Sequence, residues 1–204
     1  MSLDTANASR TIVIATHNEH KVGEIAASLV PLIVPGIDLV PTDGKAPVED
    51  GTSFEENALI KARAAFRHSG LPSLADDSGI CVDALDGAPG ILSSRYSPEE
   101  TDAANRKLLL ENMKGVKDRE AKFVCAIAFV TKQGEKVVRA EWPGVIRAAA
   151  KGTNGFGYDP IFSPDGVQGT AAELSPFEKS ALSHRARALG LIAPAVNRYF
   201  QSQL

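Results

Sequence analysis

Thr11-Ile12-Val13-Ile14-Ala15 is the stretch that decides the fold, because it is an apolar, β-branched run of the length of a buried strand. A polar loop follows at residues 16–20, and residues 21–30 then repeat apolar side chains at helical spacing. This order of strand, loop and helix is typical of α/β proteins. The loop carries neither a Gly-x-Gly-x-x-Gly fingerprint nor a Walker pattern, so the two common nucleotide-binding motifs are absent from it.

Further helices and strands alternate along the rest of the chain. Helices are expected at about residues 52–68, 97–113, 175–189 and 194–200, and strands at 73–75, 80–82, 121–131 and 136–142. The last two strands form a hairpin through Gln133-Gly134, and a Gly-rich loop follows at residues 151–158. The sequence therefore predicts a mixed α/β sheet flanked by helices, with a hairpin extension.

The helices expected at Ser97 and Ser175 share a start signal, in which serine is the N-cap, proline follows, and glutamate stands at the third position. Residues 1–10 are polar and are expected to be a disordered N-terminal tail. The remaining residues, 11–204, are expected to form one domain, either undivided or built from two closely joined lobes.

The composition is that of an ordinary globular protein, with 44% hydrophobic and 23% charged residues among 204. A net charge of −3 gives no sign of the basic excess that nucleic-acid binding favours. Prolines and charges interrupt the longest apolar region, residues 29–40, so no membrane span is expected. Cys81 and Cys125 lie in apolar stretches, and two buried, unbridged thiols predict a reducing compartment, the cytoplasm.

Two adjacent carboxylates, Asp76 and Asp77, stand out in Leu74-Ala75-Asp76-Asp77-Ser78-Gly79. Neighbouring side chains of a strand point to opposite faces, so one carboxylate could face a ligand while the other faces the scaffold. A carboxylate at a strand end suits a hard cation such as Mg²⁺, or a water that must be oriented. An ordinary turn is the alternative, because Asp, Ser and Gly are common turn residues.

The loop Thr16-His17-Asn18-Glu19-His20-Lys21 precedes a helix N-terminus, where backbone N–H groups attract anions. Thr16, Asn18 and Lys21 add side-chain donors, so the loop could hold phosphate. Helix capping is the alternative reading of the same residues. The two histidines lack the further ligands of a zinc site.

A second polar segment runs from Glu49-Asp50-Gly51 into a helix that carries Asn57 and Lys61 on one face. Lys61 could neutralise phosphate charge, and Glu49 or Asp50 could share a cation with Asp77. In the alternative reading the acids stabilise the helix start and Lys61 is solvated.

Two later segments could contact a base. The Gly-rich loop allows close approach of its backbone to a ligand, and Phe156 offers a flat face for stacking. Lys179, His184 and Arg185 supply donors for phosphate or base-edge oxygens. A flexible connector and an exposed basic helix face are the alternatives.

Together these segments resemble the Ham1-like, or inosine triphosphate pyrophosphatase, family. The matching stretches, in order, are residues 15–21, 51–58, 75–79, 87–90 with 94–96, 155–160, and 178–180 with 183–185.

The resemblance implies an elongated mixed α/β sheet flanked by helices, with two lobes and a central nucleotide-binding cleft, in a homodimer. It also implies Mg²⁺-dependent hydrolysis of ITP, dITP and XTP to the monophosphate and pyrophosphate. The alternatives are a pyrophosphatase for another altered nucleotide and a non-catalytic nucleotide-binding module.

The resemblance further assigns roles to individual residues. Asp77 is implied as general base and metal ligand, Glu49 as the second metal carboxylate, and Lys61 as a catalytic cation. Substrate contacts are implied for Thr16, His17, Asn18, Glu19, His20, Lys21, Ser78, Phe156, Gly157, Tyr158, Asp159, Lys179, His184 and Arg185.

Overall fold

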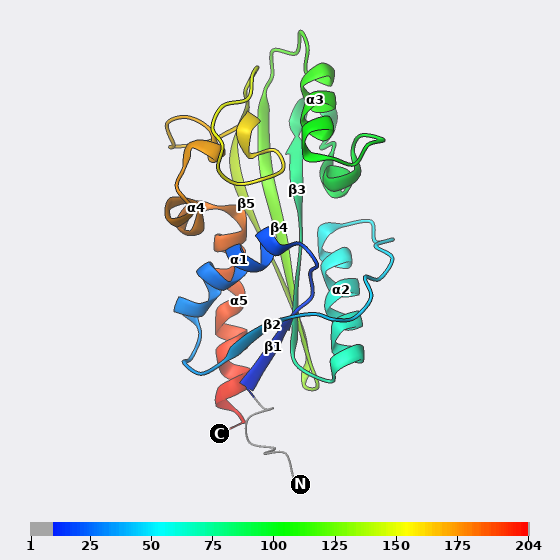
Figure 1. Cartoon of the computed structure of the whole chain (residues 1–204), viewed down its shortest axis with the longest axis vertical. Helices are drawn as coiled ribbons and strands as arrows, with labels where there is room; N and C mark the ends of the chain where they lie inside the picture. The colour runs from blue at the N-terminus through cyan, green and yellow to red at the C-terminus, as the bar shows by residue number, and fades with distance from the viewer. Residues whose placement is uncertain (1–9, 204) are drawn as a thin grey trace. The chain divides into compact units, whose positions relative to one another are not determined.

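A computed structural model describes residues 10–203 of the chain (Figure 1). The disordered tail expected at residues 1–10 thus lies outside the described residues, except for Arg10. The Arg10 guanidinium donates a hydrogen bond of 3.0 Å to the carbonyl oxygen of Pro35. Arg10 is therefore part of the folded structure.

The strands form one mixed six-stranded sheet with the order β2-β1-β3-β4-β5-β6. Their bounds are β1 Thr11–Ile14, β2 Asp38–Pro41, β3 Ser73–Val82, β4 Glu120–Thr131, β5 Gly134–Ile146 and β6 Phe162–Pro164. β1 runs parallel to both β2 and β3, whereas β5 and β6 are antiparallel. Only two residues connect β4 to its neighbour β5, as in the predicted hairpin. The mixed α/β sheet with flanking helices is confirmed.

The helices are α1 Glu19–Leu29, α2 Phe54–Ser69, α3 Asp102–Asn112, α4 Pro176–Leu182 and α5 His184–Gln201. Short 3₁₀ turns are η2 Val30–Leu32, η3 Asp83–Leu85, η4 Gly90–Arg95, η5 Asp159–Ile161 and η6 Ala171–Glu173. Within residues 10–203, no helix combines the length and the apolar character that crossing a membrane requires.

The chain divides into two compact units. Unit 1 comprises Met1–Asp77, Ala126–Arg139 and Ala188–Leu204, and unit 2 comprises Ser78–Cys125 and Ala140–Arg187. The boundaries fall inside β3, β5 and α5 and within β4, so single elements contribute residues to both units. The organisation as one domain with two lobes stays a prediction.

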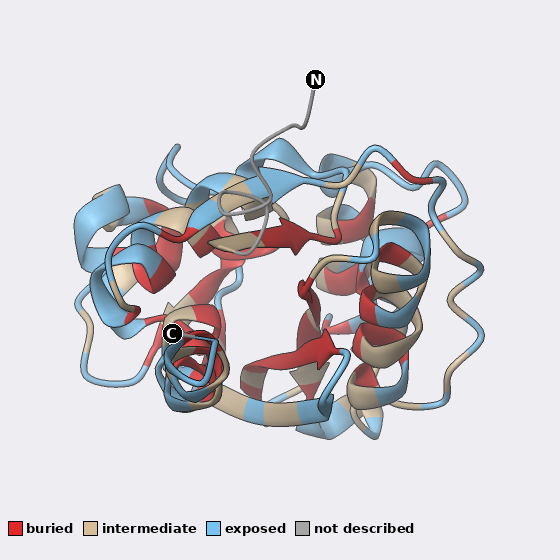
Figure 2. Cartoon of the chain, turned by 90° about the horizontal axis from the view of Figure 1, so that it is seen from below, coloured by how far each residue is buried: buried red, intermediate tan, exposed pale blue. Residues whose placement is uncertain are grey.

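Each unit has its own buried apolar residues. In unit 1 the core includes Ile12 of β1, Leu74 of β3 and Ala62 of α2, all fully buried. In unit 2 it centres on Trp142 and Phe162, whose ring centroids are 5.8 Å apart. Most residues of β1, β3 and β4 are buried, whereas most of β2 and β5 are exposed or half-buried, and the helices carry both buried and exposed residues (Figure 2). This is the pattern of amphipathic helices against a sheet.

The prediction of two short strands around an Asp-Asp turn is wrong, because β3 continues without a break through residues 76–79. Gly79 is needed for packing rather than for a turn. A Cβ at this position would overlap the carbonyl oxygen of Gly90 and the Ser93 hydroxyl. That hydroxyl in turn accepts a hydrogen bond of 2.9 Å from the Ile80 amide.

The helix predicted from Ser97 begins later, at Asp102, with Thr101 as its N-cap. Ser97 is used differently, because both its amide and its hydroxyl donate to the Asn105 side-chain oxygen, at 2.7 and 2.8 Å. Glu100 has a φ of 51°, a left-handed conformation that a helix cannot contain.

The helix predicted over residues 175–189 ends at Leu182, because Ser183 is extended. The Ser183 hydroxyl accepts from the Ala186 amide at 3.2 Å and so caps the start of α5. α5 continues through Pro194, where the sequence suggested a new helix. Pro194 has no N–H, so the carbonyl oxygen of Gly190 lacks its helical hydrogen bond. Both residues are exposed, so water can donate to that oxygen instead.

The two cysteines differ in burial. Cys125 is buried as predicted, whereas Cys81 is half-buried.

Candidate functional site

Three ionisable side chains of unit 1 meet in what we call the lysine–carboxylate centre: Glu49, Lys61 and Asp77. The Lys61 Nζ lies 2.8 Å from Asp77 Oδ1 and 3.2 Å from Glu49 Oε2. Only 11% of each of the Lys61 and Asp77 side chains is exposed, against 31% for Glu49. Glu49 is the acid that pairs with Lys61, whereas the adjacent Asp50 is exposed.

The start of α2 places Lys61 in the centre. Ser53 is the N-cap and accepts a hydrogen bond from the Glu56 amide, and Lys61 follows two turns later. Asn57, one turn before Lys61, is fully buried. Its side chain accepts from the Gly51 amide at 2.9 Å and donates to Asp77 at 3.5 Å. Asn57 therefore joins the loop after Glu49 to the strand that carries Asp77.

The charges of the centre shift its protonation equilibria. Burial raises the pKa of the Asp77 carboxyl, and this outweighs the opposing effects of Lys61 and Lys21. Burial alone would lower the pKa of Lys61, but the nearby carboxylates of Asp77, Asp76 and Glu49 together raise it. Lys61 is therefore held as an ammonium ion, and Asp77 accepts a proton more readily than an ordinary aspartate.

Asp76 pairs with a different helix from Asp77, as strand alternation predicts. Its carboxylate is fully buried and lies 3.1 Å from Lys21 Nζ of α1. Three carboxylates and two ammonium groups are thus gathered around this part of β3. The excess of negative charge is one unit when all five groups are ionised.

The loop before α1 makes several local contacts. Asn18 is the N-cap of α1 and accepts from the Lys21 amide, while Thr16 accepts from the Asn18 amide at 3.2 Å. The His17 ring lies 2.9 Å from the carbonyl oxygen of Gly44. Glu19 and His20 are exposed in the first turn of the helix. Substrate contacts of these residues stay predictions.

A second group of side chains, in unit 2, is called here the aromatic–cation cluster: Phe156, Asp159, Lys179 and Arg185. Lys179 Nζ lies 2.5 Å from Asp159 Oδ2 and 4.9 Å from the centre of the Phe156 ring. The Arg185 guanidinium carbon is 5.8 Å from the same ring, and its Nη2 donates to the Ser78 hydroxyl at 2.9 Å. Two cations therefore approach one aromatic ring, in the range of cation–π attraction.

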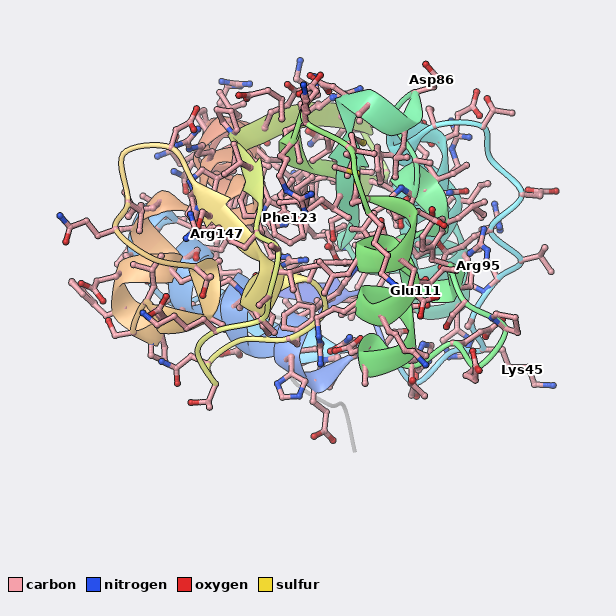
Figure 3. All side chains as sticks on the ribbon, turned by 90° about the horizontal axis from the view of Figure 1, so that it is seen from above. Lys45, Asp86, Arg95, Glu111, Phe123 and Arg147 are labelled. Carbon is pink, nitrogen blue, oxygen red and sulfur yellow. The ribbon has the colours of Figure 1, made fainter. Side chains whose placement is uncertain are left out.

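Two other predicted contact residues belong to the core of unit 2. The Tyr158 side chain is buried, and its hydroxyl donates to the carbonyl oxygen of Ser93 at 2.8 Å. The buried His184 ring stacks on Phe123 at 4.7 Å (Phe123 is labelled in Figure 3) and lies 6.3 Å from Trp142. Any ligand contact of Tyr158 would come from its backbone.

Three residues near these groups were not predicted as site residues. The sequence placed Asn57 on the same helical face as Lys61 but gave it no role in the site. Asp102 and Arg106 of α3 hydrogen-bond to Gly157, both at 2.6 Å. The only feature of the sequence that could have pointed to Asp102 and Arg106 is their opposite charge at positions i and i+4 of a predicted helix.

The fold and the two groups define a class: an α/β protein with a buried lysine–carboxylate centre suited to phosphate chemistry and an aromatic–cation cluster suited to a base. Residues 12–195 match the model of the Ham1 family. The chain belongs to this family, as its motifs predicted.

Related proteins cover nearly the whole chain. A dITP/XTP pyrophosphatase of Leifsonia xyli is 52% identical, over 91% of this chain and 94% of that protein. The structure of a HAM1 protein from Coxiella burnetii is 39% identical, with a TM-score of 0.82, over 92% of this chain and 98% of that one. The nucleoside-triphosphatase, or dITP/XTP pyrophosphatase, of Mycobacterium abscessus is 47% identical, with a TM-score of 0.72, over 90% and 99%.

Proposed function

We propose that this chain hydrolyses the deaminated purine nucleotides ITP, dITP and XTP to the monophosphate and pyrophosphate, and so removes them from the nucleotide pool. The relatives from Leifsonia xyli and Mycobacterium abscessus are named dITP/XTP pyrophosphatases, and each matches over more than nine-tenths of its length. The observation that carries the proposal is Lys61, a buried ammonium held between Asp77 and Glu49. A binding module without catalysis would not need this arrangement.

A divalent metal is generally needed by nucleotide pyrophosphatases, and we propose Mg²⁺ here. Asp77 and Glu49 supply the hard oxygen donors that Mg²⁺ prefers, and the excess negative charge near them favours a cation. Residues 10–203 hold no group of three or more His, Cys, Asp or Glu side chains placed for a metal. Two carboxylates nevertheless fit, because Mg²⁺ takes its other ligands from water and substrate phosphates. The bound ion would offset negative charge on the phosphates.

The protein groups have distinct tasks in the attack of water on the α-phosphorus. Asp77 orients the water and takes its proton, a task that a raised carboxyl pKa assists. Lys61 stabilises the negative charge of the phosphate oxygens in the transition state. Lys21, fixed by Asp76 at the start of α1, provides a second positive charge for the triphosphate.

The aromatic–cation cluster is proposed to select the base. Arg185 donates to the Ser78 hydroxyl and approaches the Phe156 ring, so this cluster offers a guanidinium donor beside an aromatic face. Donors such as Arg185 suit the 6-oxo acceptor of hypoxanthine and xanthine, whereas the 6-amino group of adenine would leave them unpaired. Such a site can discriminate by roughly 10⁴-fold.

The test is pyrophosphate release from ITP, dITP, XTP, GTP, ATP and pyrimidine triphosphates, with Mg²⁺ and with a chelator. We expect release from the first three, only in the presence of the metal. Equal release from ATP would contradict the proposed substrate class. A preference for a pyrimidine would favour the alternative of another altered nucleotide.

Three further properties stay predictions of the sequence and of the family resemblance: the homodimer, the cytoplasmic location and the two lobes. Light scattering on the purified chain would measure the first.

A further inference from the structure

Helix α3 holds both backbone hydrogen-bonding groups of Gly157. The Asp102 carboxylate accepts from the Gly157 amide at 2.6 Å, and Arg106 Nη1 donates to the Gly157 carbonyl oxygen, also at 2.6 Å. Asp102 and Arg106 are one helical turn apart and therefore lie on one face of α3. Both bonds involve an ionised side chain, which makes them stronger than neutral ones.

Gly157 has a backbone conformation that depends on its being glycine. Its φ is 59°, in the left-handed region that glycine enters without strain. Its amide belongs to the peptide plane shared with Phe156, and its carbonyl to the plane shared with Tyr158. Fixing both planes fixes the rotation about the Gly157 Cα and hence the direction in which the chain leaves Phe156.

The residues on either side of Gly157 have contacts of their own, one at the Phe156 backbone and one at the Tyr158 side chain. The Phe156 amide donates to Asp159 at 2.9 Å, and Asp159 in turn pairs with Lys179. The Tyr158 side chain is buried in the core of unit 2. The two bonds from α3 add a restraint at Gly157, between these contacts.

We propose that Asp102 and Arg106 are positioning residues that set base selectivity, by holding Gly157 and thereby the Phe156 ring against Lys179 and Arg185. Neither residue needs to touch the nucleotide. The inference rests on the proposed function and deepens it, because it assigns selectivity to a helix outside the family motifs quoted above.

The first variant is Arg106→Ala, with Lys107→Ala as its matched control. Lys107 is the next residue of the same helix, is exposed, and offers an equal loss of charge. We expect Arg106→Ala to raise KM for ITP by roughly tenfold to a hundredfold, the range of a lost charged hydrogen bond, with a smaller change in kcat. The ratio of kcat/KM for ITP to that for ATP should fall at least tenfold. Lys107→Ala should leave both quantities unchanged.

The second set of variants is Asp102→Ala and Asp102→Asn, with Glu111→Gln as the control. Asparagine keeps an acceptor for the Gly157 amide, so Asp102→Asn should retain most of the selectivity that Asp102→Ala loses. Glu111 lies at the other end of α3 and is labelled in Figure 3. Arg106→Lys keeps one donor and should likewise restore part of the selectivity, which also covers the case that Arg106→Ala does not fold.

A purely structural role would lower the amount of active enzyme equally for every substrate. Variants with lower turnover but an unchanged ITP to ATP ratio would therefore overturn the inference. If the unmodified protein released no pyrophosphate from ITP, the proposed function would fail first. Amide hydrogen exchange would then test whether α3 restrains Gly157. Faster exchange of residues 156–159 in Asp102→Ala supports this restraint, and unchanged exchange overturns it.

Discussion

Replacing Lys61 by methionine removes the positive charge of the lysine–carboxylate centre while keeping a side chain of similar length. Asp77 and Glu49 then remain near each other without their shared cation. The variant should lose both stability and activity, for reasons that can be given separate magnitudes.

Removing one partner of a fully buried ion pair costs roughly 3–5 kcal/mol. We expect about 3 kcal/mol here, the lower end of that range, because Glu49 is 31% exposed and can be hydrated. For activity, the loss of one group that stabilises transition-state charge costs about 10²–10³ in turnover. Both effects follow from the burial of the Lys61 ammonium.

Arg63→Met is the matched control, because Arg63 lies on the same helix and pairs with Glu135 at 2.6 Å. The Arg63 and Glu135 side chains are 46% and 36% exposed, and such surface pairs contribute at most about 1 kcal/mol. Urea unfolding gives the free energies of unfolding, and pyrophosphate release from ITP gives the turnover. The reasoning is refuted if Lys61→Met keeps the turnover of the unmodified protein, or loses no more stability than Arg63→Met.

Three further substitutions test the packing of β3, the helix α1 and the aromatic–cation cluster. Gly79→Ala should cost about 3 kcal/mol, because its Cβ meets the backbone of Gly90, which cannot give way. Gly23→Ala, with nothing within 4 Å, should instead stabilise α1 by about 0.5–1 kcal/mol, and equal unfolding midpoints for the two variants would contradict this account. Arg185→Lys keeps a positive charge but loses the planar donor set, so it should lower the ITP to ATP selectivity by about tenfold. A change in turnover alone, with base preference intact, would show that Arg185 does not contact the base.

Local signals predicted the elements whose contacts are local. The β-branched run of β1 and the helix α2 behind its Ser53 cap appear where the pattern placed them. The failures have long-range causes. The Ser97 hydroxyl donates to the Asn105 side chain instead of capping a helix, so α3 begins later than predicted. Gly79 lies inside a continuous strand because the Gly90 carbonyl oxygen leaves no room for a Cβ there.

The sequence motifs were sufficient to propose Glu49, Lys61 and Asp77 as site residues, but not the residues that hold them in place. The hydrogen bond between Asn57 and Asp77 could not be predicted from their spacing, because 20 residues separate them in the chain. Asp102 and Arg106 were missed for a similar reason, since their partner is a backbone 51 residues away from Arg106. A side chain that bonds to a backbone group does not require a particular residue type at the partner position, so the sequence there does not reveal the contact.

Pyrophosphate release by Asp77→Asn, with saturating ITP and Mg²⁺, tests the central claim most directly. Asparagine has nearly the same shape and keeps an oxygen near Lys61, but it cannot accept a proton from water or offer a charged metal ligand. We predict a folded protein that has lost nearly all of its turnover. Turnover equal to that of the unmodified protein would contradict the assignment of Asp77 as the catalytic carboxylate.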